Sequence, residues 1–385
     1  MSVQRHFVLA AGGTGGHMIP AYSLAQELQR RGHRVALITD ERGAKIPGVG
    51  EEVQTHILPA GRVGAGIRSW PRAIRDILQG RERARRLYEV FEPAAVVGFG
   101  GYPALPSLLA ALSGGIRTII HEQNAVLGRT NRFLAGRVDV IATAYEQVDR
   151  LKSRYRDKVV LVGNPVREDV RLLREAPFPA LLPEGVFRIL VTGGSQGASV
   201  LSEVVPEGLG LLPLTFRRRL QVTQQCRPED IDAVRQRYAA LGIPADLATF
   251  LPDLPARLGW AHLVIGRAGA STIAELTAVG RPAILVPYPS ATDDHQTANA
   301  RELANGGGAR VIPQSRFTAI ELAKQMQKLA LDPEALANAA RCARQIGRPD
   351  AAERLADIVE FGSPELAGTA SRSEASGDIL KGAFA

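Results

Sequence analysis

The stretch VIGRAGASTIAEL, residues 264–276, contains a complete passage from a buried strand into a helix. Its first residues are apolar, Gly266 and Gly269 interrupt the run, and a helical pattern follows. The free backbone N–H groups and the positive dipole end of such a helix attract anions, and small residues let a diphosphate approach the backbone. Glu275, about one turn into the helix, is placed to accept two sugar hydroxyls.

The same residues also allow a purely structural interpretation. Ser271 and Thr272 are residue types that cap helices, and Glu275 stands three residues after Thr272, which is the spacing of a capping box. An ordinary capped helix and an anion site both remain open from this stretch alone.

The chain contains two openings in which a strand runs through a glycine loop into a helix. His6–Ala11 is apolar and leads into GGTGGH, Gly12–His17, before a helical pattern over Ile19–Arg30. Phe187–Thr192 leads into GGSQG, Gly193–Gly197, and a second helical stretch. Because 385 residues exceed the usual size of one domain, these openings predict two similar α/β domains.

Other short apolar runs predict the remaining strands. They are Arg34–Thr39, Gln54–Leu58, Ala95–Gly98, Arg117–Ile120, Val138–Ala142, Val159–Val162, Gln221–Gln225, Ala248–Phe250, Leu263–Ile265 and Ala283–Val286. Helices are expected over 72–91, over 106–112 and within 317–361. HEQN at 121–124 and GNPVR at 163–167 directly follow two predicted strands. The carboxyl ends of parallel strands share one edge of a sheet, where α/β proteins bind ligands.

The first glycine loop also suggests a dinucleotide-binding fold. Asp40 stands after the second predicted strand, where a ribose-binding acid would be. Counted from Gly13, however, the fingerprint needs a third Gly or Ala where the chain has Met18. An NAD-linked oxidoreductase therefore rests only on Asp40 and a single glycine loop.

The positive charge is concentrated in the first half of the chain. The net charge is +8, and residues 1–165 hold 23 basic against 14 acidic side chains, which leaves about −1 for the remainder. Residues 62–86 alone carry eight Arg against Asp76 and Glu82. Such a half indicates an anionic partner, such as nucleic acid, a membrane surface or a phosphorylated substrate. No aromatic series accompanies the arginines, which argues against a nucleic-acid binder.

Apolar side chains lie among these arginines, at Ile67, Trp70, Ile74, Ile77 and Leu78. Arginines that bind anionic head groups beside apolar side chains that enter lipid would make this an interfacial segment. The same spacing also fits an amphipathic helix packed on the sheet with a solvated basic face. Both interpretations remain open.

No membrane-spanning segment or disulfide framework is expected. The chain starts as a strand rather than as a signal peptide, and the uncharged run Pro93–Ile116 contains glycines and prolines that break it into strand, loop and helix. The two cysteines, Cys226 and Cys342, have no metal-ligand spacing and fit a reducing compartment. The tail at 362–385 is rich in Gly, Ala and Ser and is expected to be disordered.

Seven motifs occur in a fixed order between about residues 6 and 361: GGTGGH, GGY, HEQN, GNPVR, GGSQG, GRAGASTIAE and HQTANA. In this order they resemble glycosyltransferase family 28, and in particular its members that act in peptidoglycan synthesis. The resemblance implies an α/β protein with the GT-B fold, two Rossmann-like parallel-sheet domains that face each other across a cleft. It implies inverting transfer of GlcNAc from UDP-GlcNAc to the 4-hydroxyl of MurNAc-pentapeptide in undecaprenyl-diphosphate-linked lipid I, which gives lipid II.

The resemblance also implies how the chain is divided. Residues 1–163 would bind the lipid acceptor and the membrane, 164–344 would bind UDP-GlcNAc, 345–361 would return to the first domain, and 362–385 would be the tail. The implied partners are UDP-GlcNAc, lipid I, an anionic membrane surface at Ile67–Leu78 and other cell-wall synthesis proteins, without nucleic acid, cofactor or metal. The implied location is the cytoplasmic face of the plasma (inner) membrane, as a peripheral protein.

Family positions that bind UDP-GlcNAc correspond to a set of residues in both halves. They are Thr14, Gly15, Gly16, Asn124, Arg167, Ser195, Leu251, Ala270, Ser271, Thr272, Ile273, Ala274, Glu275 and Gln296. By resemblance, Phe250 and the Leu251 backbone meet the uracil, Glu275 holds the ribose, Ser195 lies at the phosphates and Gln296 contacts the sugar.

The reaction needs a general base, for which His17 is the first candidate and Glu122 the second. A structural role for His17 in shaping its glycine loop stays open, and His295 is given no chemical role because some family members carry Gln there. Two other classes remain as alternatives: a GT-B transferase with another lipid acceptor, such as diacylglycerol, and a non-catalytic sugar-nucleotide binder.

Overall fold

The computed structural model describes residues 3–46, 53–59, 70–182, 184–194, 197–330 and 332–362. Ser195, Ile67 and the tail from residue 363 onward lie outside these ranges, so the predictions made for them stay predictions. The chain divides into two compact units. Unit 1 comprises Met1–Pro165 and Asp350–Ala385, and unit 2 comprises Val166–Pro349.

Unit 1 is built on a seven-stranded parallel sheet in the order β3-β2-β1-β4-β5-β6-β7. The order reverses between β1 and β4, and the carboxyl ends of strands at such a switch point are where α/β folds bind ligands. The strands are β1 (His6–Ala10), β2 (Arg34–Thr39), β3 (Gln54–Ile57), β4 (Ala95–Gly98), β5 (Arg117–Glu122), β6 (Val140–Thr143) and β7 (Val159–Leu161).

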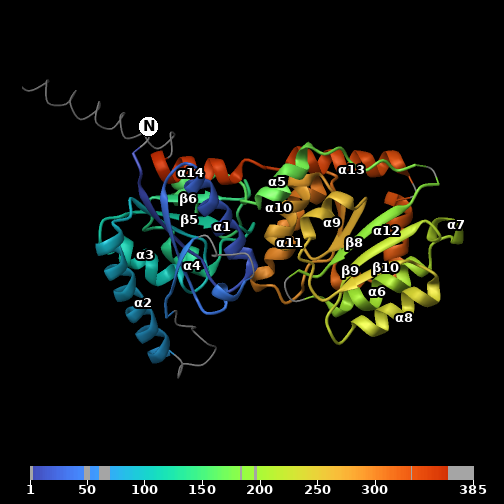
Figure 1. Ribbon diagram of the computed structural model, residues 1–385, viewed down its shortest axis with the longest axis horizontal. Coiled ribbons are helices and arrows are strands. Elements are labelled where there is room, and N and C mark those ends of the chain that lie inside the picture. The colour runs from blue at the N-terminus through green and yellow to red at the C-terminus, as the bar shows by residue number, and fades with distance from the viewer. Residues whose placement is uncertain are drawn as a thin grey trace, which may run out of the picture. The chain divides into compact units, whose positions relative to one another are not determined.

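Helices cover both faces of this sheet (Figure 1). They are α1 (Gly15–Arg30), α2 (Trp70–Phe91), α3 (Ala104–Ser113), α4 (Arg129–Leu134) and α14 (Ala351–Phe361), with short turns η1 (Gly43–Lys45) and η3 (Ser153–Lys158). Successive β1 residues point to opposite faces, so Phe7 and Leu9 pack with α1 and α14, whereas Val8 and Ala10 pack with α2, α3 and α4. Each large apolar side chain buried in this way contributes about 1.5–3 kcal/mol.

Ion pairs fasten α14 to the start of unit 1. The Arg31 guanidinium contacts Asp357 at 2.6 Å and also Glu360, whose other carboxylate oxygen contacts His33. Arg5 donates to the Glu360 carbonyl at 2.6 Å. The last described helix of the chain is therefore part of the first unit's core.

Unit 2 repeats the strand order with a six-stranded parallel sheet, β10-β9-β8-β11-β12-β13. The strands are β8 (Phe187–Thr192), β9 (Leu220–Gln225), β10 (Ala245–Ala248), β11 (Leu263–Gly266), β12 (Ala283–Leu285) and β13 (Ala309–Val311). The helices are α5 (Glu168–Leu172), α6 (Ser199–Gly210), α7 (Leu214–Arg217), α8 (Ile231–Leu241), α9 (Leu254–Trp260), α10 (Ala270–Val279), α11 (His295–Asn305), α12 (Ala319–Ala330) and α13 (Pro333–Ile346), with short turns η4 (Leu173–Glu175), η5 (Thr292–Asp294) and η6 (Gln314–Arg316).

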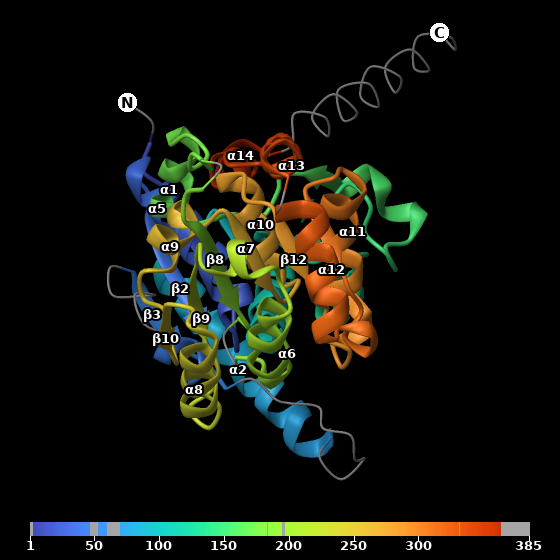
Figure 2. The same cartoon turned by 90° about the vertical axis from the view of Figure 1, so that its right-hand side faces the viewer.

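The main core of unit 2 lies between its sheet and the helices α6, α8 and α12 (Figure 2). Ile189 and Val191 of β8 pack there with Leu201 of α6, Tyr238 of α8 and Leu322 of α12. A smaller cluster joins α5 to α10 and is formed by Val166, Val170, Ala278 and Val279. This cluster packs Val166, the first residue of unit 2, against α10, the helix of the candidate donor site.

The predicted fold class, two Rossmann-like α/β parallel-sheet domains, is confirmed. The uncharged run Pro93–Ile116 separates into β4, a loop and α3, as predicted. Among the described residues, no helix combines the length and the apolar character needed to cross a membrane.

Several predicted element boundaries are wrong, and one strand was missed. Helix α1 begins at Gly15 rather than Ile19, and strand β5 continues past Ile120, because its last two residues pair with β6. Strand β10 ends at Ala248 instead of starting there, and β13 was not predicted at all. The strands among these elements are short, and pairing with a neighbouring strand decides their extent.

Candidate active site

Helix α10 follows β11 at the carboxyl edge of the second sheet. Its N-cap is Gly269, and no side-chain cap is formed there within the described part of the chain. Neither Ser271 nor Thr272 is the N-cap, because both residues lie inside the first turn, and the buried Ser271 hydroxyl has no partner among the described residues. Because no described side chain caps the first backbone N–H groups of α10, these groups can bind an anion.

Glu275 is the carboxylate of α10 that the sequence assigned to ribose. It is buried, and its Oε1 accepts a hydrogen bond from Arg167 over 3.1 Å. Burial raises the pKa of Glu275, and the Arg167 guanidinium opposes that rise. The capping-box interpretation of Glu275 is therefore wrong, since this carboxylate is held by a cation from the residue that precedes α5.

The other predicted residues of α10 differ in exposure. Ala270 and Ile273 are buried, and Ala274 packs against the Val166–Val170 cluster. Ile273 and Ala274 therefore belong to the face of α10 that packs on the rest of unit 2. The backbone N–H groups of the first turn lie at the carboxyl end of β11.

Gln296 ties together the loops that follow β11 and β12. Its amide oxygen accepts from the Ala268 N–H at 3.2 Å and from the Tyr288 N–H at 2.9 Å. These two donors fix which end of the amide is the oxygen, so the Gln296 nitrogen lies on the other side. The neighbouring His295 contacts the Thr292 carbonyl through Nδ1 at 2.8 Å.

Two predicted uracil contacts follow β10. Leu251 is buried, whereas Phe250 is 60% exposed. An exposed aromatic ring next to a buried backbone position is suited to stacking on a base. Ser195, the predicted phosphate contact, lies outside the described residues.

The candidate site residues of unit 1 lie where β1, β4 and β5 end. Thr14 is the N-cap of α1, Gly15 and Gly16 begin that helix, and His17 follows in its first turn. Gly100 adopts a φ of +86°, and a Cβ at this position would lie 3.3 Å from the His17 ring. A glycine here therefore allows the loop after β4 to pass close to the imidazole.

Glu122, the second base candidate, is bound by four N–H groups. Its Oε1 accepts from the backbone and side-chain nitrogens of Asn124 at 3.0 and 3.3 Å. Its Oε2 accepts from the Gly128 N–H at 2.8 Å and from Asn131 at 2.9 Å. Both oxygens thus hold the loop after β5, and this carboxylate is better suited to shaping the site than to taking a proton.

Sequence reasoning assigned no role to two residues of this site, His121 and Gln123. Gln123 Oε1 lies 3.2 Å from His17 Nδ1, and Gln123 Nε2 lies 3.0 Å from His121 Nδ1. His121 Nε2 contacts the Gly163 carbonyl at 2.9 Å. Both residues are part of HEQN, but the sequence did not show that they are buried or that Gln123 lies between His121 and His17.

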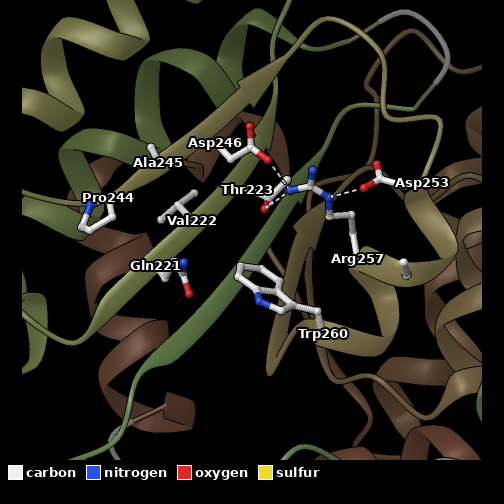
Figure 3. A pocket seen from close by; sticks show the side chains of 10 residues that line it. Gln221, Val222, Thr223, Pro244, Ala245, Asp246, Asp253, Arg257 and Trp260 are labelled. Carbon is white, nitrogen blue, oxygen red and sulfur yellow. Dashed lines mark hydrogen bonds and ion pairs between the residues drawn. The ribbon is translucent and has the colours of Figure 1, made fainter.

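A separate pocket lies beside the starts of β9 and β10 (Figure 3). Its charged groups are already paired, since Arg257 contacts Asp246, Asp253 at 2.8 Å and the Thr223 hydroxyl at 3.0 Å. The pocket is away from the carboxyl ends of the strands, so it is not a candidate for the donor site. Within the described ranges, no three His, Cys, Asp or Glu side chains are grouped to hold a metal ion.

Two Rossmann-like parallel sheets, each with glycine loops and polar residues at its carboxyl edge, are the architecture of the GT-B fold. The family 28 N-terminal domain matches residues 7–143, and the family 28 C-terminal domain matches residues 188–355. The chain belongs to glycosyltransferase family 28.

Close relatives span nearly the whole chain. One from Zymomonas mobilis is 68% identical over 94% of this chain and 93% of its own length, and one from Novosphingobium aromaticivorans is 64% identical over 95% and 94%. Both are named UDP-N-acetylglucosamine–N-acetylmuramyl-(pentapeptide) pyrophosphoryl-undecaprenol N-acetylglucosamine transferase. The crystal structure of Acinetobacter baumannii MurG is similar with a TM-score of 0.74 and 30% identity, over 92% of this chain and 99% of that one.

Proposed function

We propose that this glycosyltransferase moves GlcNAc from UDP-GlcNAc to the 4-hydroxyl of MurNAc-pentapeptide in lipid I, with inversion at the anomeric carbon, and so makes lipid II for peptidoglycan. The observation that carries the proposal is the 68% identity, over 94% of the chain, to a relative whose name states this transfer. The candidate site supplies groups suited to each part of the reaction.

Unit 2 binds the donor in this proposal. The amides at Ala270, Ser271 and Thr272 receive the diphosphate, Glu275 accepts the ribose hydroxyls, and Gln296 donates to the sugar. As the bond between C1 and the diphosphate oxygen breaks, negative charge grows on the departing UDP. A preorganised donor at such a position is worth about 3–4 kcal/mol, so the helix N-terminus supports departure of UDP without a metal.

Unit 1 binds the acceptor and supplies the base. His17 takes the proton of the 4-hydroxyl while that oxygen bonds to C1 of GlcNAc, and general base catalysis of this kind contributes about 10²–10⁴-fold. In the same proposal, Thr14, Gly15 and Gly16 at the start of α1 and Asn124, which contacts Glu122, are the positions of unit 1 that bind UDP-GlcNAc.

The surface of α2 is the proposed membrane contact. One face of α2 packs on α3 through small residues such as Ala73 and Ala84, which agrees with the packed-helix interpretation. Ile74 and Leu78, however, are 53% and 56% exposed, and the Arg75 side chain is exposed beside them. Exposed apolar side chains among arginines suit an anionic bilayer, so we place the protein peripherally on the cytoplasmic face of the plasma membrane.

The deciding experiment measures UDP release from UDP-GlcNAc with a short-chain lipid I analogue, and identifies the disaccharide product by mass. We expect turnover that persists in EDTA and that falls strongly with UDP-glucose. Release of UDP with diacylglycerol but not with lipid I would favour the other GT-B alternative. Tight UDP-GlcNAc binding without turnover on either acceptor would favour a sugar-nucleotide binder.

A further inference from the structure

We infer that Gln123 and His121 are positioning residues that hold His17 in the tautomer with its proton on Nδ1, so that Nε2 carries the lone pair that receives the acceptor's proton. The inference rests on the proposed function only for the role of His17 as base. The hydrogen bonds that fix the tautomer of His17 are all formed between residues of unit 1.

The order of these hydrogen bonds starts at the Gly163 carbonyl, which can only accept. His121 Nε2 lies 2.9 Å from this oxygen, so Nε2 must carry a proton. His121 is completely buried and its ring lies 5.3 Å from that of Phe99. Burial lowers the pKa of His121 to about 4, so near neutral pH the ring has one proton and its Nδ1 is an acceptor.

The Gln123 amide is oriented by two acceptors at once. Its Nε2 lies 3.0 Å from His121 Nδ1 and 3.2 Å from the His121 carbonyl oxygen. Both acceptors require N–H groups, so the nitrogen must occupy this position and the amide cannot be reversed without placing oxygen against two acceptors. The oxygen of Gln123 therefore faces His17.

His17 completes the order as a donor. Gln123 Oε1 is an acceptor 3.2 Å from His17 Nδ1, so Nδ1 carries the proton and the lone pair of the neutral ring is on Nε2. When Nε2 takes the proton of the acceptor hydroxyl, the charge of the imidazolium is stabilised by the Gln123 oxygen. In a serine protease triad, replacing the aspartate that orients the catalytic histidine by asparagine gives the wrong tautomer and lowers kcat by about 10⁴-fold. Loss of the correct tautomer can therefore remove most of the contribution of a histidine base.

The first test is spectroscopic and needs no substrate. Protein labelled with ¹⁵N-histidine gives long-range proton–nitrogen correlations that distinguish a protonated from a bare ring nitrogen, and the His17→Gln variant assigns the His17 signals. At neutral pH we expect an unprotonated Nε2 on His17 and an unprotonated Nδ1 on His121. A proton on His17 Nε2 in the neutral ring would overturn the inference, whether or not the protein turns over lipid I.

Two variants of similar size test the effect on the reaction. Gln123→Glu keeps an acceptor toward His17 in either protonation state, and its neutral form also keeps a donor toward His121. Gln123→Met removes both groups. We expect Gln123→Met to lower kcat by about 10²-fold or more at unchanged donor KM, and Gln123→Glu to keep kcat within about tenfold of the wild type.

The matched variants also separate positioning from simple support of the fold. If Gln123 only fills space, Met should be tolerated at least as well as Glu, and that result would contradict the inference. In the Glu variant a carboxylate beside His17 would favour the imidazolium, so the acidic limb of kcat/KM should shift to higher pH. If the wild type itself releases no UDP with lipid I, the proposed function fails while the spectra still decide the tautomer.

Discussion

Arg167 donates to Glu275 over 3.1 Å and so holds a buried carboxylate at the start of α10. Burial alone would favour the uncharged carboxyl, and the guanidinium partly restores the charged form. The hydrogen bond restricts the orientation of the Glu275 carboxylate through a residue that precedes α5. The pair therefore links the sequence motif GNPVR to the motif GRAGASTIAE, which are more than a hundred residues apart.

Replacing Glu275 by Gln should weaken donor binding. A charged acceptor that receives sugar hydroxyls contributes about 1.5–3 kcal/mol, so the donor KM should rise roughly 10- to 100-fold with a smaller change in kcat. Steady-state kinetics and calorimetry with UDP-GlcNAc would measure the loss. Glu168→Gln on the exposed surface of α5 is the control, and equal KM values for the two variants would refute the ribose assignment.

Replacing Arg167 by Met should make donor binding depend on pH. Without the guanidinium the pKa of Glu275 rises further above its ordinary value of 4.5, so the carboxylate that binds ribose is lost at a higher pH than in the wild type. The donor KM should therefore climb as pH falls. The free energy of unfolding of this variant should have the opposite pH dependence and increase as pH falls. Because the folded state favours the protonated carboxyl, stability is lost as pH rises through the pKa of Glu275 in the folded state.

The control for this prediction is Arg171→Met, which removes a half-buried arginine of α5 that pairs with Glu168. Donor titrations and urea unfolding from pH 5 to 8 would measure both effects. A donor KM in Arg167→Met with the same pH dependence as in the control would show that Arg167 does not act through Glu275.

Replacing His17 by Ala should lower kcat by about 10²–10⁴-fold and leave the donor KM nearly unchanged, because the base acts in the chemical step and lies in the other unit. UDP release at saturating donor would measure the loss. A donor KM that rises in proportion to the loss of kcat/KM would instead indicate that His17 only shapes its loop.

Replacing Glu122 by Gln should destabilise unit 1. Each oxygen of Glu122 receives two N–H donors, so whichever end becomes the NH₂ group will face two donors. Leaving buried donors unpaired costs about 1–3 kcal/mol, which lowers the melting temperature by several degrees. Calorimetric melting would measure it. An unchanged melting temperature together with a loss of kcat would favour Glu122 as the base.

Replacing Ile74 or Leu78 by Glu should weaken binding to vesicles that contain anionic lipid, because each change removes an exposed apolar side chain and places a negative charge among arginines. Co-sedimentation at two salt concentrations would measure it, and turnover of a soluble short-chain acceptor should be kept. Val90→Glu is the control, as it changes an exposed apolar residue near the other end of α2. Equal binding by all three variants and the wild type would place the membrane contact elsewhere.

The sequence by itself determined the elements whose signals are local. Short apolar runs predict most strands of the two sheets, and the order of seven motifs indicated the family. Short elements were missed where the deciding interaction is not local. Strand β13 has three residues and depends on β12, and α1 begins on glycines whose backbone geometry is fixed by the turn before it.

The tertiary structure decided what the polar residues of the site do. The spacing of Thr272 and Glu275 matches a capping box, yet Glu275 lies against Arg167 because α5 packs on α10. HEQN shows four polar residues in a row, but only the fold places Gln123 between His121 and His17. Spacing along the chain specifies which groups are near in sequence, whereas burial and long-range packing determine which donor meets which acceptor.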